Sequence, residues 1–466
     1  LDYSNQLAGN LQDAYIRDDN KPVPRQSFGP GLLSSPFLFF SNLISKFVSI
    51  KSNTSLNYFI YSFTSAFYLY LSLIFLMRIV KVNNVKEKSK VLLFTLGSGV
   101  SYYAFERFSM SVVYEFFSIC LTFYVVDKIY NLKKTKNINF LILSLPVIQF
   151  LMLTNRWNNL HLFLIPFIYV FLFKKDLKII YKNIYFYIGN FIGISLFLLH
   201  TYLLYGIVTF LQKDIYPYEG WVVSERISNL AKLENFSDNL VLVWKYFLTT
   251  CFSMEFGIFY FSAIIFASSF FLLFYIYKKQ YGIFTLLFIF YSIPFLPILV
   301  YVSHGTSYGF RYLFTIIPVN IIIYFKEFRS NRFLNYYLII FSIFGIISQL
   351  FFESTELVTL STNTIINSFN SPSPYANPDY LSGFLKSILM PSAYLKIIFT
   401  SFIGVFLIKF ISFFTNFEEL IRDYYTVDEK LSELILSINE FTWIYFLLVV
   451  SMALLSINKL LFKSHK

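Results

Sequence analysis

Long apolar runs alternate with short polar segments along most of the chain. A helix needs about 20 apolar residues to cross the hydrocarbon core of a bilayer, and fewer where a neighbouring helix or a short loop caps it. By this measure twelve runs are predicted to be membrane-spanning helices: 57–80, 91–105, 111–126, 139–153, 158–173, 183–205, 256–277, 281–302, 311–325, 333–352, 394–415 and 441–460. At this density of apolar residues only helices satisfy every backbone polar group in lipid. The predicted fold class is therefore an all-α polytopic membrane protein.

The composition supports the same class. Hydrophobic residues make up 56% of the 466 residues and charged residues only 14%, against roughly 25% charged residues in an ordinary globular protein. The mean hydropathy is +0.60. So few charges cannot cover a water-facing surface, so most of the chain must face lipid or its own interior. A soluble enzyme, a disordered protein and a disulfide scaffold are excluded.

Basic residues gather in every second loop between the predicted spans. They are Arg78, Lys81, Lys86, Lys88 and Lys90, then Lys128, Lys133, Lys134 and Lys136, then Lys174, Lys175, Lys178 and Lys182, then Lys278 and Lys279, then Lys326, Arg329 and Arg332. Cytoplasmic loops are enriched in Lys and Arg, so these five loops are expected inside the cell and the N-terminus outside. The same distribution argues against a nucleic-acid-binding face. The last span is less well placed, because the basic tail that follows it falls on the outside.

The topology divides the chain into three predicted regions. They are a first extracytoplasmic loop with surface helices at 1–56, a transmembrane module at 57–352, and a last region of outside loop and transmembrane helices at 353–466. The segment 416–440 is expected to be an interfacial helix on the cytoplasmic side. The chain starts without Met and without an apolar segment. An outside N-terminus needs a preceding helix to carry it across, so a first transmembrane helix is expected upstream of Leu1.

Several short stretches occur in an order typical of one enzyme family. The first loop opens on Asp2-Tyr3 and closes on Phe28-Gly-Pro-Gly-Leu-Leu-Ser-Ser-Pro36. Further stretches are SYYAFERFSMS at 101–111, TNRWNN at 154–159, FGIFYFS at 256–262 and HGTSYGFRY at 304–312. With these motifs, the chain from Leu1 to about Tyr324 resembles the GT-C glycosyltransferases, in particular protein mannosyltransferase and aminoarabinose transferase-like members.

The resemblance implies transfer of a sugar from a polyprenyl-phosphate carrier to an acceptor hydroxyl on the extracytoplasmic side of a membrane, here the bacterial inner membrane. Such chemistry needs a carboxylate as base and cations that neutralise the phosphate leaving group. Asp2 and Glu106 are the expected catalytic residues. The residues expected to bind the donor phosphate are Arg107, Arg156, His304 and Arg311, and the secondary candidates are Asp18, Asp19 and Tyr308.

Plainer roles remain open for several of these residues. Asp18 or Asp19 could take the role of Asp2, or both could be solvated loop charges. Glu106 and Arg107 could form a local surface ion pair, which contributes little to stability. Arg156, beside Trp157, could anchor the chain at the membrane interface. Glu115, near the outer end of the third span, is expected to pair with a neighbour.

The sequence leaves the cofactor and the acceptor open. The four His and two Cys are scattered and form no zinc-type cluster. No cofactor is identified, and a divalent metal ion is left open, with Glu106 as a residue that could lie near it. The expected partners are the polyprenyl-phosphate sugar, the bilayer and an acceptor that is a glycan, a lipid or a protein. No nucleic acid is expected.

Three other functions would leave different signals in the sequence. A lipid-linked glycan transporter or flippase would place ionisable residues near mid-membrane and show an internal repeat, and neither is visible. A glycan polymerase or ligase would use a late outside loop, but 353–390 is poor in Arg and His. A non-catalytic membrane subunit is compatible with the composition.

Overall fold

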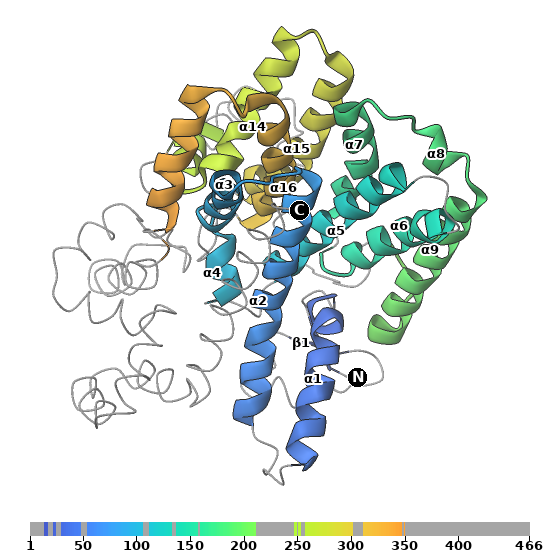
Figure 1. Cartoon of the computed structure of the whole chain (residues 1–466). Helices are drawn as coiled ribbons and strands as arrows, with labels where there is room; N and C mark the ends of the chain where they lie inside the picture. The colour runs from blue at the N-terminus through green and yellow to red at the C-terminus, as the bar shows by residue number, and fades with distance from the viewer. Residues whose placement is uncertain are drawn as a thin grey trace, which may run out of the picture. The chain divides into compact units, whose positions relative to one another are not determined.

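The computed structural model describes residues 14–16, 22–24, 29–47, 54–105, 111–132, 137–156, 159–210, 247–248, 250–252, 257–301, 311–346 and 349. Nearly all of them are helical (Figure 1). Two three-residue strands, β1 (Ala14–Ile16) and β2 (Pro22–Pro24), pair antiparallel. Across the described residues the all-α fold class is confirmed, with this short hairpin as an addition that the sequence did not predict.

The chain divides into two compact units, each built from separated segments. Unit 1 comprises Leu1–Leu33, Tyr114–Trp244 and Ser269–Tyr301, and unit 2 comprises Ser34–Val113, Lys245–Ser268 and Val302–Lys466. Each of the three regions predicted at 1–56, 57–352 and 353–466 is continuous in the sequence, whereas each compact unit combines separate segments. The predicted division into regions therefore stays a prediction.

Unit 1 contains most of α5 (Val112–Asn131) and the helices α6 (Asn137–Leu153), η2 (Asn159–Leu164), α7 (Ile165–Phe173), α8 (Lys178–Tyr181), α9 (Ile184–Tyr205) and α15 (Tyr281–Tyr301). Helices α6 and α9 lie side by side (Figure 1). Two glycines of α9 make this approach possible. A Cβ on Gly189 would lie 2.2 Å from the Leu143 carbonyl oxygen, and one on Gly193 would lie 2.6 Å from the Phe150 ring. Small residues spaced by four let helix backbones approach closely, as in membrane helix pairs.

Unit 2 contains most of α1 (Gly29–Phe47) and the helices α2 (Thr54–Ile79), α3 (Val85–Leu96), α4 (Val100–Phe105), α13 (Ile258–Phe261), η4 (Arg311–Ile316), α16 (Ile317–Ile323), η5 (Tyr324–Phe328) and Arg332–Ile346. The start of α14 (Ala263–Tyr277) also belongs to it. Helices α2, α3, α4 and α16 contact one another. Their shared interior is aromatic, with Phe94, Tyr103 and Tyr324 fully buried.

The second predicted span, 91–105, is not one continuous helix. It breaks between α3 and α4 at Gly97–Gly99, where Gly99 has a φ of 101°, a conformation that favours glycine. Gln349 covers the break: its Nε2 donates to the Leu96 carbonyl at 2.8 Å, and its Oε1 accepts from the Tyr102 N–H at 3.0 Å. The Ser262 hydroxyl donates to the Ser98 carbonyl at 2.8 Å. Backbone groups freed by the break are therefore satisfied by side chains.

Two other predicted spans start with a tighter helix. In both 158–173 and 311–325 a six-residue 3₁₀ segment, η2 or η4, precedes an α-helix that starts on Ile-Pro. Proline has no N–H to donate and is preferred in the first turn of a helix. Pro166 and Pro318 therefore mark where the α-helical bonding begins, and the preceding residues take i to i+3 bonds instead.

One described helix, α9, is long and apolar enough to cross a membrane by itself. Shorter apolar helices of 10–17 residues are Phe63–Ile79, Ile138–Leu153, Asn159–Phe173, Ala263–Tyr277, Tyr281–Phe295 and Arg332–Ile346. The described residues thus do not establish the number of twelve spans, which stays a prediction.

Candidate functional site

Most of the residues predicted for catalysis lie outside the described part of the chain. These are Asp2, Asp18, Asp19, Glu106, Arg107, His304 and Tyr308. Arg156 and Arg311 are described, Arg156 in unit 1 and Arg311 in unit 2.

Arg156 lies at the end of a tight turn that closes α6. The Thr154 N–H donates to the Leu151 carbonyl at 3.2 Å, and the Asn155 N–H donates to the Met152 carbonyl at 3.0 Å. The Asn159 N–H then donates to the Arg156 carbonyl at 3.1 Å, where η2 begins. Arg156 thus lies between the end of α6 and the start of η2.

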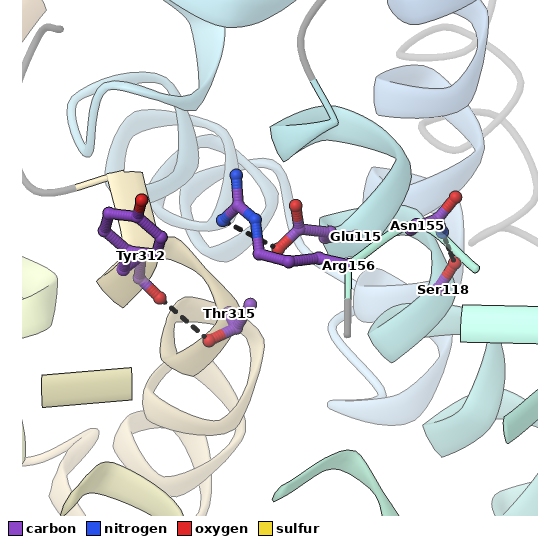
Figure 2. A network of polar contacts seen from close by, with 6 residues as sticks. All are labelled: Glu115, Ser118, Asn155, Arg156, Tyr312 and Thr315. Atoms are coloured by element: carbon purple, nitrogen blue, oxygen red, sulfur yellow. Dashed lines mark hydrogen bonds and ion pairs between the residues drawn. The ribbon is translucent and has the colours of Figure 1, made fainter. Parts of the chain in front are cut away.

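The Arg156 side chain is held by a buried carboxylate. Its Nη1 lies 3.3 Å from Glu115 Oε2, with side-chain exposures of 17% for Arg156 and 2% for Glu115 (Figure 2). A carboxylate removed from water needs a counter-charge close by. The expected pairing of Glu115 with a neighbour is confirmed, and its partner is one of the predicted phosphate-binding residues.

The residue beside Arg156 is held by the same helix. The Asn155 Nδ2 donates to Ser118 Oγ at 3.1 Å (Figure 2). One turn further along α5, the Thr122 hydroxyl lies 3.5 Å from Met152 Sδ. Glu115, Ser118 and Thr122 are spaced by three and four residues, so they share one face of α5. This face, which we call the α5 polar stripe, positions the end of α6 and the turn after it.

The turn also contacts the segment that closes the first predicted loop. The Gly29 N–H donates to the Thr154 carbonyl at 2.7 Å. A Cβ at Gly29 would lie 2.1 Å from Asn155 Oδ1 and 2.5 Å from the Asn155 backbone nitrogen, so only glycine fits there. Gly29 and Thr154 belong to two of the stretches on which the family resemblance depends, and unit 1 brings these two together.

Arg311 is the first residue of η4 in unit 2. Its guanidinium lies over the Tyr312 ring, 5.5 Å from the ring centroid. The Tyr312 carbonyl accepts from the Thr315 hydroxyl at 3.2 Å (Figure 2). The following helix, α16, is fixed by Asn320, whose Nδ2 donates to the Ile264 carbonyl at 2.7 Å. Arg311 therefore lies on a well-anchored segment and stacks on an aromatic ring.

The sequence did not indicate the roles of three residues at this turn. Gly29 packs against Asn155, and Ser118 and Asn155 form a hydrogen bond. The available signal was the spacing of Glu115, Ser118 and Thr122 within an otherwise apolar span. Polar residues within a span usually face the bundle interior and bond one another there.

The described residues contain no group of three or more His, Cys, Asp or Glu side chains that could hold a metal ion. The possible divalent metal ion therefore has no ligand set in that part of the chain. Comparisons with protein-family models, with curated proteins and with solved structures give no match.

Proposed function

We propose that this protein is a membrane glycosyltransferase of the GT-C type. It would move a sugar from a polyprenyl phosphate to an acceptor hydroxyl on the extracytoplasmic side of the membrane. The observation that carries the proposal is the contact of Gly29 with the turn that bears Arg156. Two of the stretches on which the family resemblance depends, 28–36 and 154–159, contact each other through Gly29 and Thr154. The second stretch contains Arg156, which forms an ion pair with the buried carboxylate of Glu115.

Arg156 has the chemistry that the donor phosphate requires. A guanidinium carries five N–H donors in a planar fork, so one arginine can bind a carboxylate and a phosphate together. The Glu115 carboxylate limits the rotation of the Arg156 side chain, and less conformational entropy is then lost when a ligand binds. In this proposal Asp2 is the base that removes the acceptor proton, with Asp18 or Asp19 as alternatives.

Three described contacts between predicted loops each join segments on one predicted side of the membrane. In unit 2, Glu87 pairs with Arg329, which joins two loops that are both expected in the cytoplasm. In unit 1 the Tyr130 hydroxyl donates to the Asp176 carbonyl at 2.8 Å, and these residues also lie in two predicted cytoplasmic loops. On the outer side, Gly29 contacts Thr154. Each of these contacts joins segments that are predicted on one side, which supports the alternating topology.

The exposed side chains of α9 suit a lipid environment. Ile184, Tyr187, Phe191, Leu199 and Leu203 are all exposed, with Phe191 at 73%. In water a continuous apolar surface of this kind is unfavourable and promotes association. Acyl chains would cover it while Gly189 and Gly193 face α6. The membrane placement of the proposal is supported by this division of the helix surface.

The proposal is tested by sugar transfer in reconstituted membranes. A radiolabelled polyprenyl-phosphate hexose serves as donor, and transfer to envelope glycans or lipids is measured. Asp2→Asn is expected to abolish transfer. Arg156→Gln is expected to lower kcat by about 100-fold, the usual loss when one charge-stabilising donor is removed. Lys174→Gln, a matched loss of one charge on the predicted cytoplasmic side, should leave turnover unchanged.

Two results would overturn the proposal. One is undiminished turnover in both Asp2→Asn and Arg156→Gln. The other is recovery of the full-length protein in the soluble fraction after cell lysis, because a polyprenyl donor is confined to the membrane.

A further inference from the structure

Helix α3 is attached to η5 and to the helix Arg332–Ile346 by a row of contacts along one face. Glu87 forms an ion pair with Arg329. One turn later, Lys90 Nζ donates to the Tyr324 hydroxyl at 3.4 Å, and that hydroxyl donates to Asn335 Oδ1 at 2.8 Å. Phe94 packs edge-on against the Tyr324 ring at 5.1 Å. Two predicted cytoplasmic loops are therefore held together at one end of unit 2.

This attachment concentrates positive charge. Residues 78–90 and 326–332 contain eight basic and two acidic residues. We call the basic ones the α3–η5 basic cluster: Arg78, Lys81, Lys86, Lys88, Lys90, Lys326, Arg329 and Arg332. Both carboxylates are already engaged, Glu87 by Arg329 and Glu327 by Lys326 at 2.6 Å. The cluster therefore keeps a large excess of positive charge.

Two lysines of this cluster, Lys86 and Lys90, lie close enough to repel each other. Burial lowers the pKa of Lys90, and repulsion by the nearby charge of Lys86 lowers it further. Burial also lowers the pKa of Lys88. Like charges held together in this way favour an anion between them, because an anion relieves the repulsion. Lys86 and Arg332 are exposed and accessible to such an anion.

An apolar stripe starts directly beside the basic cluster. On the helix Arg332–Ile346, the side chains of Phe333, Tyr336, Ile340 and Ile343 are exposed, with Phe333 at 72%. Their spacing of three and four residues puts them on one face of the helix. At 1.5 Å per residue the stripe is about 15 Å long, and one leaflet of a bilayer core has about the same thickness.

We propose that the α3–η5 basic cluster and this apolar stripe together bind an anionic phospholipid of the cytoplasmic leaflet. The phosphate would lie among Lys86, Lys90 and Arg332, and an acyl chain would run along Phe333, Tyr336 and Ile340. Basic clusters next to a membrane-spanning helix attract anionic lipids of that leaflet. A nucleic acid or a soluble polyphosphate would use the charges but not the apolar stripe, which favours the lipid.

The inference rests on the membrane placement proposed above but does not depend on sugar transfer. A failed transferase assay leaves it standing, whereas a protein that is not in the membrane removes both. The site lies at the predicted cytoplasmic ends of its helices, on the other side of the membrane from the proposed donor site.

The test measures lipid binding to the full chain purified in detergent. Phosphatidylglycerol or phosphatidylcholine is titrated in, and bound lipid is counted by native mass spectrometry. The wild type is expected to prefer phosphatidylglycerol. The triple variant Lys86→Gln, Lys90→Gln and Arg332→Gln should bind phosphatidylglycerol at least about tenfold more weakly, because each basic residue near the surface contributes to the attraction. Binding of phosphatidylcholine should not change.

Two controls make the outcome decisive. The triple variant Lys174→Gln, Lys175→Gln and Lys278→Gln removes the same charge from other predicted cytoplasmic loops and should bind like the wild type. Ile340→Ser, in the apolar stripe, should weaken phosphatidylglycerol binding although all charges remain. Equal phosphatidylglycerol binding by the two triple variants would overturn the inference. So would displacement of the lipid by millimolar glycerol phosphate, which carries the same charge without acyl chains.

Discussion

At the scale of single residues, the candidate site depends on one buried carboxylate and on one glycine that lets two backbone segments approach closely. Glu115 holds Arg156, and Gly29 lets the chain pass close to Asn155. The sequence indicated the first of these, because an acidic residue in an apolar span needs a partner. It could not indicate the second, since the requirement for glycine arises from a contact between residues that are 126 positions apart in the chain. Local sequence does not encode such a contact.

Arg156 is expected to stabilise the fold as well as to bind phosphate. Arg156→Met leaves Glu115 buried beside an apolar side chain, and removal of one partner of a buried pair costs roughly 3 kcal/mol. The melting temperature in detergent should fall clearly. In the double variant Glu115→Gln, Arg156→Met much of this loss should be recovered. Additive losses in the double variant would mean that the two side chains do not interact.

Gly29→Ala should be damaging despite its small size. The added methyl group would meet the backbone of Asn155 as well as its side chain, so the turn that bears Arg156 would have to move. We expect a loss of stability of about 1–3 kcal/mol, typical of overpacking. Gly31→Ala is the matched control, because Gly31 is exposed in the same segment. Equal melting temperatures for both variants would contradict the close approach.

At the scale of elements, hydrophobic runs predicted where helices lie but not where they break. The span 91–105 is divided at Gly97–Gly99, and η2 and η4 precede the Ile-Pro starts of α7 and α16. The glycines and prolines were visible in the sequence. Their effect was not, because a break inside an apolar run is tolerated only where a distant side chain such as Gln349 satisfies the backbone. Tertiary contacts therefore decided these boundaries.

The α6–α9 pair gives a prediction at this scale. Gly189→Leu would place a side chain where the Leu143 carbonyl lies, and the two helices would have to separate. We expect a large drop in melting temperature, and a loss of the folded peak in size-exclusion chromatography in detergent. Leu199→Ala on the exposed face of the same helix should change stability little, because its side chain is half exposed. Similar behaviour of the two variants would argue against this packing.

At the scale of the whole molecule, the alternation of basic and non-basic loops predicts on which side of a membrane each loop lies. Two described contacts, Glu87 with Arg329 and Tyr130 with Asp176, each join loops of one predicted side, and the topology itself stays a prediction. The described residues do not determine the number of membrane-spanning helices, since among them one helix, α9, is both long and apolar enough to cross a membrane by itself. A helix that is capped by a neighbouring helix or a short loop can be shorter than about 20 residues.

The topology can be measured with introduced cysteines. Both native cysteines, Cys120 and Cys251, are buried, so background labelling should be low. A membrane-impermeant maleimide added to intact spheroplasts is expected to label Val208→Cys, just after α9. Asn83→Cys and Gln280→Cys, in predicted cytoplasmic loops, should react only after the membrane is opened. Labelling of all three positions in intact spheroplasts would refute the alternating topology.

The break in unit 2 has a consequence for biosynthesis. Gln349 covers the Leu96 carbonyl and the Tyr102 N–H, from which it is separated by 253 and 247 residues. A ribosome makes α3 and α4 long before it makes this glutamine. During that interval these two groups must be hydrated or bonded to a temporary partner, since a buried backbone polar group without a hydrogen-bond partner is costly. The joint between α3 and α4 thus reaches its final bonding only after Gln349 has been synthesised and has folded against it.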